Sequence, residues 1–201
     1  MRLESSRGEA TRKRIIRAAA DLFHQQGVSA TSPNQIIEAS NTGKSQFYHY
    51  FGSKEGLVHA VLQYYIQAVR DGKAFVQFDV ESWEGLEEWF HAQARLQERY
   101  SMTRGCPFGT IANEVTAYDE LPRQDLVLLF EVVRNKLAAF FLREKTQGHL
   151  LSTADENALA DFCIAVIQGG MLMGKTRRDG NTVDGVIDQA LAYLQSLRRK
   201  A

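Results

Sequence analysis

The chain of 201 residues carries 24 basic and 24 acidic side chains, and 44% of its residues are hydrophobic. That length can bury the core of one large domain, or of a small domain and a larger one. Two cysteines, Cys106 and Cys163, exclude a disulfide framework and lie in no zinc-type spacing, and no uninterrupted apolar run approaches the ~18 residues of a membrane span. We therefore expect a cytoplasmic protein with no membrane partner, no metal and no cofactor.

Charge is unevenly distributed along the chain. The first 54 residues contain eight basic and four acidic side chains, a net charge of +4, and the remainder has a net charge of −4. Cations gathered at one end suit a module that faces nucleic-acid phosphates, because they displace the counterions of the backbone. A solvated helix face would give the same modest asymmetry.

Helical periodicity extends along nearly the whole chain, and no pair of segments alternates with the period of two typical of strands, so the fold class is all-α. A first helix is predicted from about Thr11 to Gln26, and Gly27 ends it. The start of a second helix is indicated by three adjacent features. Ser32 is the N-cap, Pro33 is the first helical residue, and Gln35 closes a capping box.

That second helix is short and ends at Ser40-Asn41, because asparagine tolerates the left-handed conformation. A third short helix is predicted from Lys44 to Tyr50. Gly52-Ser53 ends it and precedes a long amphipathic helix that includes Leu57 to Val69.

The remaining segments also predict helices. One carries Trp83 to Phe90, and a break follows at residues 104–107. A shorter helix is expected to stop near Leu121-Pro122. Three more are predicted at 123–144, at 154–175 after a Thr153 to Glu156 capping box, and at 183–197 with Thr182 as cap.

Two short helices joined by a turn, after a basic helix, form the pattern of a helix-turn-helix. Residues 11–57 resemble the DNA-binding domain of the tetracycline-repressor family, chiefly in Ala18-Ala19-Ala20-Asp21-Leu22-Phe23, in Gly27, Ala30-Thr31-Ser32, Ile36 and Ala39, in Lys44-Ser45-Gln46-Phe47-Tyr48-His49-Tyr50-Phe51, and in Ser53-Lys54-Glu55. The resemblance implies an N-terminal three-helix DNA-binding domain over residues 1–54. It also implies a larger helical effector-binding and dimerisation domain over residues 55–201.

The resemblance also implies roles for single residues. It implies that phosphates are contacted by Thr31, Tyr48 and Lys54. It implies that base edges are contacted by Lys44, Ser45, Gln46 and His49. Lys54 begins a helix, where the dipole already favours an anion. Phe47 and Phe51 are expected in the core. Thr42, Gly43 and Ser45 depart from the residues that many relatives carry there, and Tyr48 and Tyr50 have an alternative role as interface aromatics.

In the resembling family, the C-terminal domain encloses a small-molecule pocket. The candidate effector residues are Trp89, Met102, Cys106, Phe108, Asn113, Tyr118 and Phe130. Aromatic residues on a helical stripe lie more often in the core than in a pocket, so that alternative stays open. The helices at 123–144 and 154–175 are the candidate dimer interface, with Gly169, Gly170 and Gly174 allowing close approach, and an internal helix pair is the alternative.

Cys106 lies at a break between helices, two residues after Arg104, where a cation would stabilise a thiolate. It resembles the cysteine of a family subset that senses electrophiles or oxidants. The alternative is a small buried apolar residue, which is also the interpretation of Cys163.

The sequence therefore predicts a transcriptional repressor that binds a palindromic operator as a homodimer and is released by a small-molecule or electrophile effector. An activator or an architectural DNA-binding protein with the same helices is one alternative. An enzyme using Cys106, His91 or Glu114 is another, but no nucleophile, base and orienting residue form a recognisable pattern. Gly43-Lys44-Ser45 mimics the end of a P-loop, yet Glu38 stands where its first glycine belongs. We predict no catalytic and no metal-binding residues.

Overall fold

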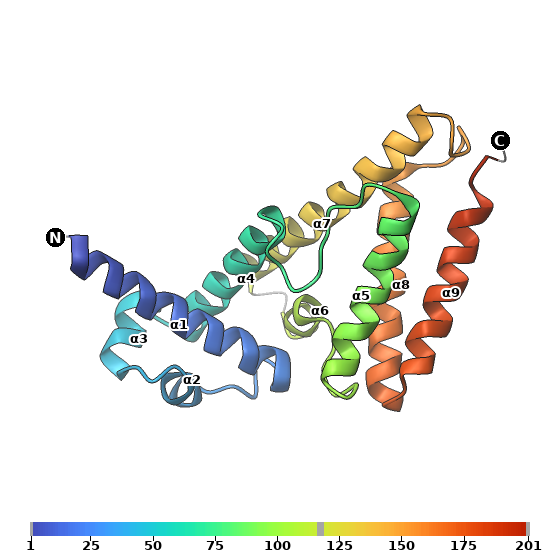
Figure 1. Cartoon of the computed structure of the whole chain (residues 1–201). Coiled ribbons are helices and arrows are strands. Elements are labelled where there is room, and N and C mark those ends of the chain that lie inside the picture. The colour runs from blue at the N-terminus through green and yellow to red at the C-terminus, as the bar shows by residue number, and fades with distance from the viewer. Residues whose placement is uncertain (1, 116–118, 200–201) are drawn as a thin grey trace. The chain divides into compact units, whose positions relative to one another are not determined.

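The computed structural model describes residues 2–115 and 119–199, with side chains from residue 7 onward. Within these residues the chain forms α-helices and no strand, as the sequence predicts (Figure 1). The helices are α1 (Arg2–Gln26), α2 (Pro33–Ala39), α3 (Lys44–Phe51), α4 (Lys54–Arg70), α5 (Trp83–Arg99), α6 (Pro107–Ala112), α7 (Glu120–Thr146), α8 (Glu156–Arg177) and α9 (Gly180–Ser196).

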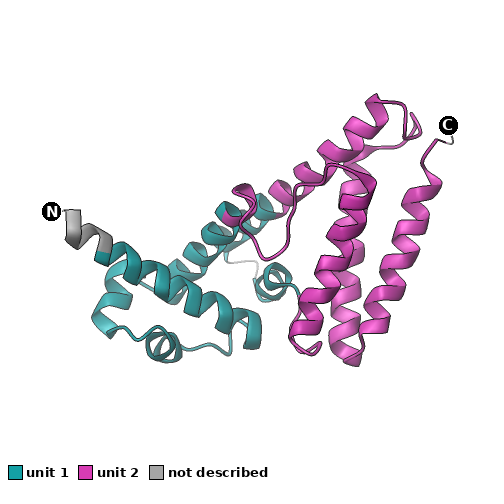
Figure 2. Ribbon diagram, in the orientation of Figure 1, with its two compact units in different colours: residues 1–67, 106–129 teal, residues 68–105, 130–201 magenta. Residues whose placement is uncertain are grey.

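The chain divides into two compact units (Figure 2). Unit 1 comprises residues 1–67 and 106–129, and unit 2 comprises residues 68–105 and 130–201. The sequence suggested one boundary after residue 54. The observed division instead gives most of α4, all of α6 and the start of α7 to the unit that contains the helix-turn-helix.

Local start and stop signals determine the helices of the helix-turn-helix. The Ser32 hydroxyl accepts a hydrogen bond from the Gln35 backbone N–H, and the Gln35 side chain accepts one from the Ser32 N–H at 2.8 Å. Asn41 adopts the left-handed conformation with φ +47° after the end of α2. The predicted capping box and left-handed stop are both confirmed.

Aromatic and branched side chains fill the core of unit 1. Phe47 and Phe51 are buried on the inner face of α3, as predicted. Ile15 and Phe23 of α1 and Ile36 of α2 are completely buried. Because these side chains come from three helices, the core holds α3 firmly in the helix-turn-helix.

In unit 2, α8 packs closely against α9 at two glycines. A Cβ atom added to Gly174 would lie 2.5 Å from Val183 Cγ2, and one added to Gly170 would lie 3.4 Å from Val186 Cγ1. At these two positions the helix that comes close belongs to the same chain, which is the internal helix pair given above as the alternative. Gly169 has open space at its Cβ position.

Four predicted helix boundaries are wrong. The helix expected to reach Leu121-Pro122 ends at Ala112, and Pro122 lies in the first turn of α7, where proline is tolerated. Asp155, not Thr153, caps α8, because its carboxylate accepts two backbone N–H groups. Asp179, not Thr182, caps α9. Helix α1 begins at Arg2 rather than near Thr11.

By length and composition, α8 is the one helix in the described part of the chain that could cross a membrane, with a mean hydropathy of 1.3 over 18 residues. Of that window, 39% is buried within the structure. Core helices of soluble proteins also meet this criterion, so it is weak evidence for a membrane span.

Candidate nucleic-acid interface and effector region

The outer face of α3 presents a row of polar side chains. Those of Lys44, Ser45, Gln46, Tyr48 and His49 are all exposed, and Tyr48 retains 44% of its accessible surface. The ring of Tyr48 meets that of the buried Phe47 edge to face, with centroids 5.2 Å apart. The five side chains thus lie on a short helix whose opposite face is fixed in the core.

Gln46 also closes the start of α3. Its side-chain oxygen accepts a hydrogen bond from the Gly43 N–H at 3.2 Å. Gly43 has no side chain that could accept from the N–H groups of the first turn, so the contact from Gln46 is the side-chain hydrogen bond at this helix start. With its oxygen engaged, Gln46 can offer its amide N–H groups to hydrogen-bond acceptors.

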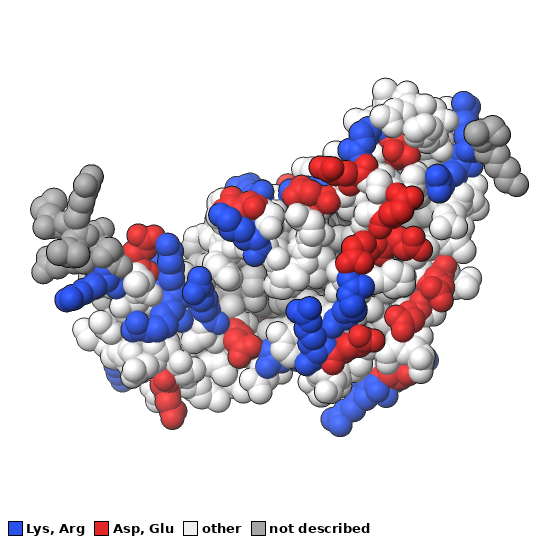
Figure 3. Space-filling model, in the orientation of Figure 1, with Lys and Arg blue, Asp and Glu red and all other residues white. Residues whose placement is uncertain are grey.

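Several cations of α1 support the fold of unit 1. Figure 3 shows lysine and arginine side chains gathered over this helix. Arg14 Nε donates to the Ser40 carbonyl at 2.8 Å, which ties α1 to the end of α2. Arg12 lies over the Phe51 ring, and Lys13 pairs with Glu9 at 2.7 Å. The positive charge of the N-terminal segment therefore has structural roles as well.

Thr31 and Lys54 differ in accessibility. Thr31 is fully buried: its hydroxyl donates to the Gly27 carbonyl at 2.6 Å and accepts from Gln26 Nε2 at 3.1 Å. Lys54 is half-buried at the first residue of α4, with its ammonium group 3.5 Å from the Ser29 carbonyl. In this arrangement the Thr31 hydroxyl serves the turn between α1 and α2.

A carboxylate that the sequence analysis did not connect with DNA binding holds the same turn. Glu114 accepts hydrogen bonds from the backbone N–H groups of Val28 at 3.1 Å and Ser29 at 2.6 Å. Burial acts to raise the pKa of Glu114. The hydrogen bonds and the charge of Lys54 outweigh it, so the pKa lies below the ordinary value of 4.5. We call this arrangement the Glu114 clamp.

Gly27 makes room for the clamp. It has φ +87°, a conformation that favours glycine, and an added Cβ would lie 2.1 Å from a carboxylate oxygen of Glu114. No local sequence signal reveals this contact, since the partners are separated by more than 80 residues.

A cavity of about 300 Å³ adjoins the clamp within unit 1. Its lining comes from the α1–α2 turn, α4 and the region of α6 and α7, and comprises Val28, Ser29, Lys54, Glu55, Val58, Ile111, Glu114, Val115, Asp119 and Pro122.

Further along α4, the buried Asp125 carboxylate of α7 contacts His59 Nδ1 at 2.6 Å and accepts from Gln63 Nε2 at 2.7 Å. These contacts join α4 to the start of α7.

The candidate effector residues are divided between the two units. Cys106, Phe108 and Asn113 belong to unit 1, and Trp89, Met102 and Phe130 belong to unit 2. Tyr118 lies outside the described residues.

Most of these candidates serve packing or helix ends. Cys106 is buried at the N-cap of α6, and Asn113 is its exposed C-cap. Phe108 packs on Tyr65 with ring centroids 5.2 Å apart, and Met102 is buried near Gly180. Phe130 is half-buried. Within its own unit, each of these buried side chains therefore has a packing role, and their joint role in effector binding stays a prediction.

Cys163 is buried in α8, and this burial raises the pKa of its thiol. A thiol held in its protonated form is a poor nucleophile, in agreement with the predicted structural role. Within residues 2–115 and 119–199, no three His, Cys, Asp or Glu side chains are grouped so that they could hold a metal ion.

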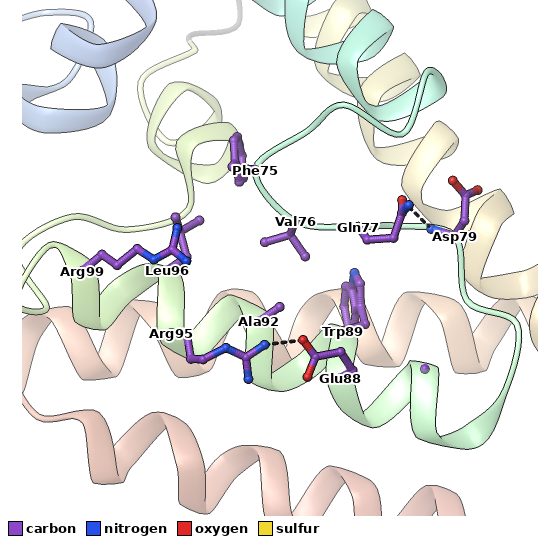
Figure 4. Close-up of a pocket in the computed structure, with 11 residues that line it drawn as sticks. Phe75, Val76, Gln77, Asp79, Glu88, Trp89, Ala92, Arg95, Leu96 and Arg99 are labelled. Atoms are coloured by element: carbon purple, nitrogen blue, oxygen red, sulfur yellow. Dashed lines mark hydrogen bonds and ion pairs between the residues drawn. The ribbon is translucent and has the colours of Figure 1, made fainter.

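Trp89 lines a second cavity, of about 290 Å³, which lies within unit 2 (Figure 4). The segment 75–79 borders it on one side and α5 on the other. The lining residues are Phe75, Val76, Gln77, Asp79, Gly85, Glu88, Trp89, Ala92, Arg95, Leu96 and Arg99.

Comparison with known protein families agrees with this architecture. A family described as "Bacterial regulatory proteins, tetR family" matches residues 15–61, and "Tetracyclin repressor-like, C-terminal domain" matches residues 83–190. The chain belongs to the tetR family of transcriptional regulators. The first match contains the helix-turn-helix, and the second contains α5 to α8 and most of α9.

Individual tetR-family relatives match over most of their length. An uncharacterised HTH-type transcriptional regulator in the lacX 3′ region of Lactococcus lactis is 29% identical, over 89% of this chain and 90% of that protein. The HTH-type transcriptional repressor DhaR of Mycobacterium sp. (strain GP1) is 23% identical, over 86% of each chain. A TetR regulator of Chloroflexus aurantiacus has the same fold, with a TM-score of 0.82 at 21% identity, over 98% of this chain and 100% of that one.

Proposed function

We propose that this tetR-family regulator is a repressor that binds a palindromic operator as a homodimer and is released by a small-molecule effector. The observation that carries the proposal is α3, whose polar face is exposed while Phe47 and Phe51 anchor the opposite face. A rigid helix with exposed hydrogen-bonding groups can enter the major groove. The relative DhaR is named a repressor.

The exposed residues have distinct proposed roles. Lys44, Ser45, Gln46 and His49 contact base edges, with Gln46 donating through its amide nitrogen. Tyr48 and Lys54 contact phosphates, which set the position of the helix without reading sequence. For Thr31 we propose a positioning role in place of the expected phosphate contact, because its hydroxyl is enclosed within the α1–α2 turn.

The exposed apolar surface of unit 2 supports a dimer interface on α8 and α9. Leu172 and Met173 of α8 and Tyr193 of α9 are 59%, 42% and 48% exposed. A groove of about 470 Å³ lies between the two helices, lined in part by Phe162 and Val186. This pair replaces the expected pair at 123–144 and 154–175, because in unit 2 α7 exposes a single large apolar residue, Leu142.

Release requires two states of the protein with different affinities for DNA. An effector shifts their populations only by as much as its own affinity differs between them. We propose the Glu114 clamp as the element that changes: its two hydrogen bonds fix the turn before α2, and their loss would loosen that turn. Because Cys106 is 8% exposed, we favour a non-covalent effector over modification of this thiol.

DNA-binding measurements at several salt concentrations test the proposal. Footprinting on the DNA that flanks the gene supplies the operator, and a reporter assay separates repression from activation. We expect Lys54→Ala to weaken binding to every duplex and to reduce its salt dependence, whereas Gln46→Ala changes sequence preference. Absence of salt-sensitive binding to any duplex would overturn the proposal, and identical sequence-independent effects of both variants would overturn the division of roles.

A further inference from the structure

The cavity of unit 2 contains a buried hydrogen-bond donor without a partner. Trp89 is 3% exposed, and its indole N–H makes no hydrogen bond to any described residue. Figure 4 shows its nitrogen directed toward the segment that carries Val76 and Gln77, across the cavity from α5. A buried donor left unsatisfied is costly, so an acceptor supplied by a ligand would be favoured at this position.

The other tryptophan provides a contrast. The indole N–H of Trp83 donates to the Glu144 carboxylate at 2.7 Å. The Oε1 atom of Gln77, which lines the same cavity as Trp89, already accepts from the Phe78 and Asp79 backbone N–H groups. The polar groups of the segment 75–79 thus provide no hydrogen-bond acceptor for the Trp89 indole N–H.

The charges around the cavity leave one cation available. Arg95 pairs with Glu88, and Asp79 pairs with Lys136. Arg99, one turn beyond Arg95 on α5, has no ion pair or hydrogen bond with the described residues. A planar guanidinium group matches a carboxylate, whose two oxygens it can bind side by side.

Four apolar side chains lie among the polar ones of the lining. Phe75, Val76, Ala92 and Leu96 contribute hydrocarbon surface, and the volume of about 290 Å³ lies just below the range of about 300–1,000 Å³ for small-molecule sites. A compact hydrocarbon body bearing one acidic group fits this combination.

We propose that this cavity binds a small organic carboxylate. One carboxylate oxygen accepts the Trp89 indole N–H, Arg99 neutralises the charge, and the hydrocarbon body lies against Phe75, Val76 and Leu96. The further role of this ligand as the effector rests on the function proposed above. The site itself does not, because it is built from contacts of unit 2 alone.

Direct binding to the full-length protein without DNA tests the site. The probes are benzoate, phenylacetate and hexanoate, each compared with its primary amide by calorimetry. We expect at least one acid to bind about tenfold or more tightly than its amide, as befits a hydrogen bond to a charged group. If no acid is preferred over its amide, the proposal is overturned.

Two variants with matched controls locate the binding. Arg99→Gln should weaken acid binding about tenfold and leave amide binding unchanged, while Arg70→Gln, at the end of α4, leaves both unchanged. Trp89→Phe keeps an aromatic ring but removes the donor, and should weaken binding of the acid, whereas Trp83→Phe should not. Circular dichroism of each variant verifies folding. Full acid binding by a folded Trp89→Phe variant would place the ligand elsewhere.

Operator release by the same acid is measured separately. Acid binding with unchanged operator affinity would retain the site and refute its effector role. Operator binding without any preference for acids would retain the regulator and refute the site.

Discussion

The polar groups of the helix-turn-helix face solvent, whereas those of the unit 2 cavity are partly enclosed. On α3, Lys44 and His49 are exposed, and the core on the opposite side holds the helix. In unit 2, Trp89 is nearly completely buried. An exposed polar row on a rigid helix suits a large partner of regular shape, while a buried donor in a small cavity of mixed polar and apolar lining suits a small molecule. The two regions therefore differ in the size of partner that they can accept.

Removal of the buried Phe47 side chain, which anchors α3, should have the largest effect on stability and DNA binding. The effect should be confined to unit 1. Phe47→Ala leaves a cavity in the core of unit 1 and should lower stability by about 3–5 kcal/mol, with loss of DNA binding. Thermal unfolding and DNA binding are measured together with calorimetric binding of the acid at the unit 2 site. The control Tyr48→Ala, on the exposed face of α3, should weaken DNA binding without a comparable loss of stability.

Charge on the α8–α9 face should abolish the proposed dimer. Combined Leu172→Glu and Met173→Glu places repelling charges on the exposed apolar surface and should yield folded monomers in sedimentation experiments. Leu142→Glu, on α7, is the matched control and should leave the dimer intact. Loss of the dimer in Leu142→Glu would instead implicate α7, as in the originally expected interface on α7 and α8.

Loss of the clamp carboxylate should have a smaller effect, confined to unit 1. Glu114→Gln removes the charge that strengthens two hydrogen bonds and should destabilise the α1–α2 turn by about 1–2 kcal/mol, weakening operator binding. Glu55→Gln, which lies on the same cavity, is the control. If Glu114→Gln and wild type bind the operator with equal affinity, DNA binding does not depend on the Glu114 clamp.

The pH dependence of stability provides the most sensitive test of the clamp. The folded pKa of Glu114 lies below 4.5, so the stabilisation is present above that value and is lost as the pH falls through the lower folded pKa. Denaturant unfolding between neutral and acidic pH should show a smaller loss for Glu114→Gln than for wild type. Identical pH profiles would mean that the carboxylate contributes nothing.

The sequence predicted well those features that depend on neighbouring residues. The Ser32 capping box, the left-handed Asn41 and the inward Phe47 are each encoded within a few positions, and the structure contains all three. The starts of α8 and α9 were harder to predict, because Asp155 and Asp179 compete with nearby threonines for the same N-cap role.

The sites depend on contacts between distant residues, and there the predictions were limited. Glu114 meets Val28 and Ser29 only through tertiary folding. Likewise, Thr31 resembles a phosphate ligand in sequence, but its burial depends on how the turn packs. Trp89 was recognised as a candidate effector residue, but its unsatisfied indole N–H follows from the path of the segment 75–79. Periodicity identifies a buried face and does not reveal which of its groups lack a partner.

The close packing of α8 on α9 at Gly170 and Gly174 bears on how the regulator responds to its own concentration. The two helices are already assembled within one chain, so formation of the proposed dimer would need little further ordering of the backbone. Dilution should then give folded single chains before any unfolding occurs. Where such dissociation takes place, occupancy of a two-fold symmetric operator rises with the square of the protein concentration, which gives a sharper onset of repression than a single-chain binder would show.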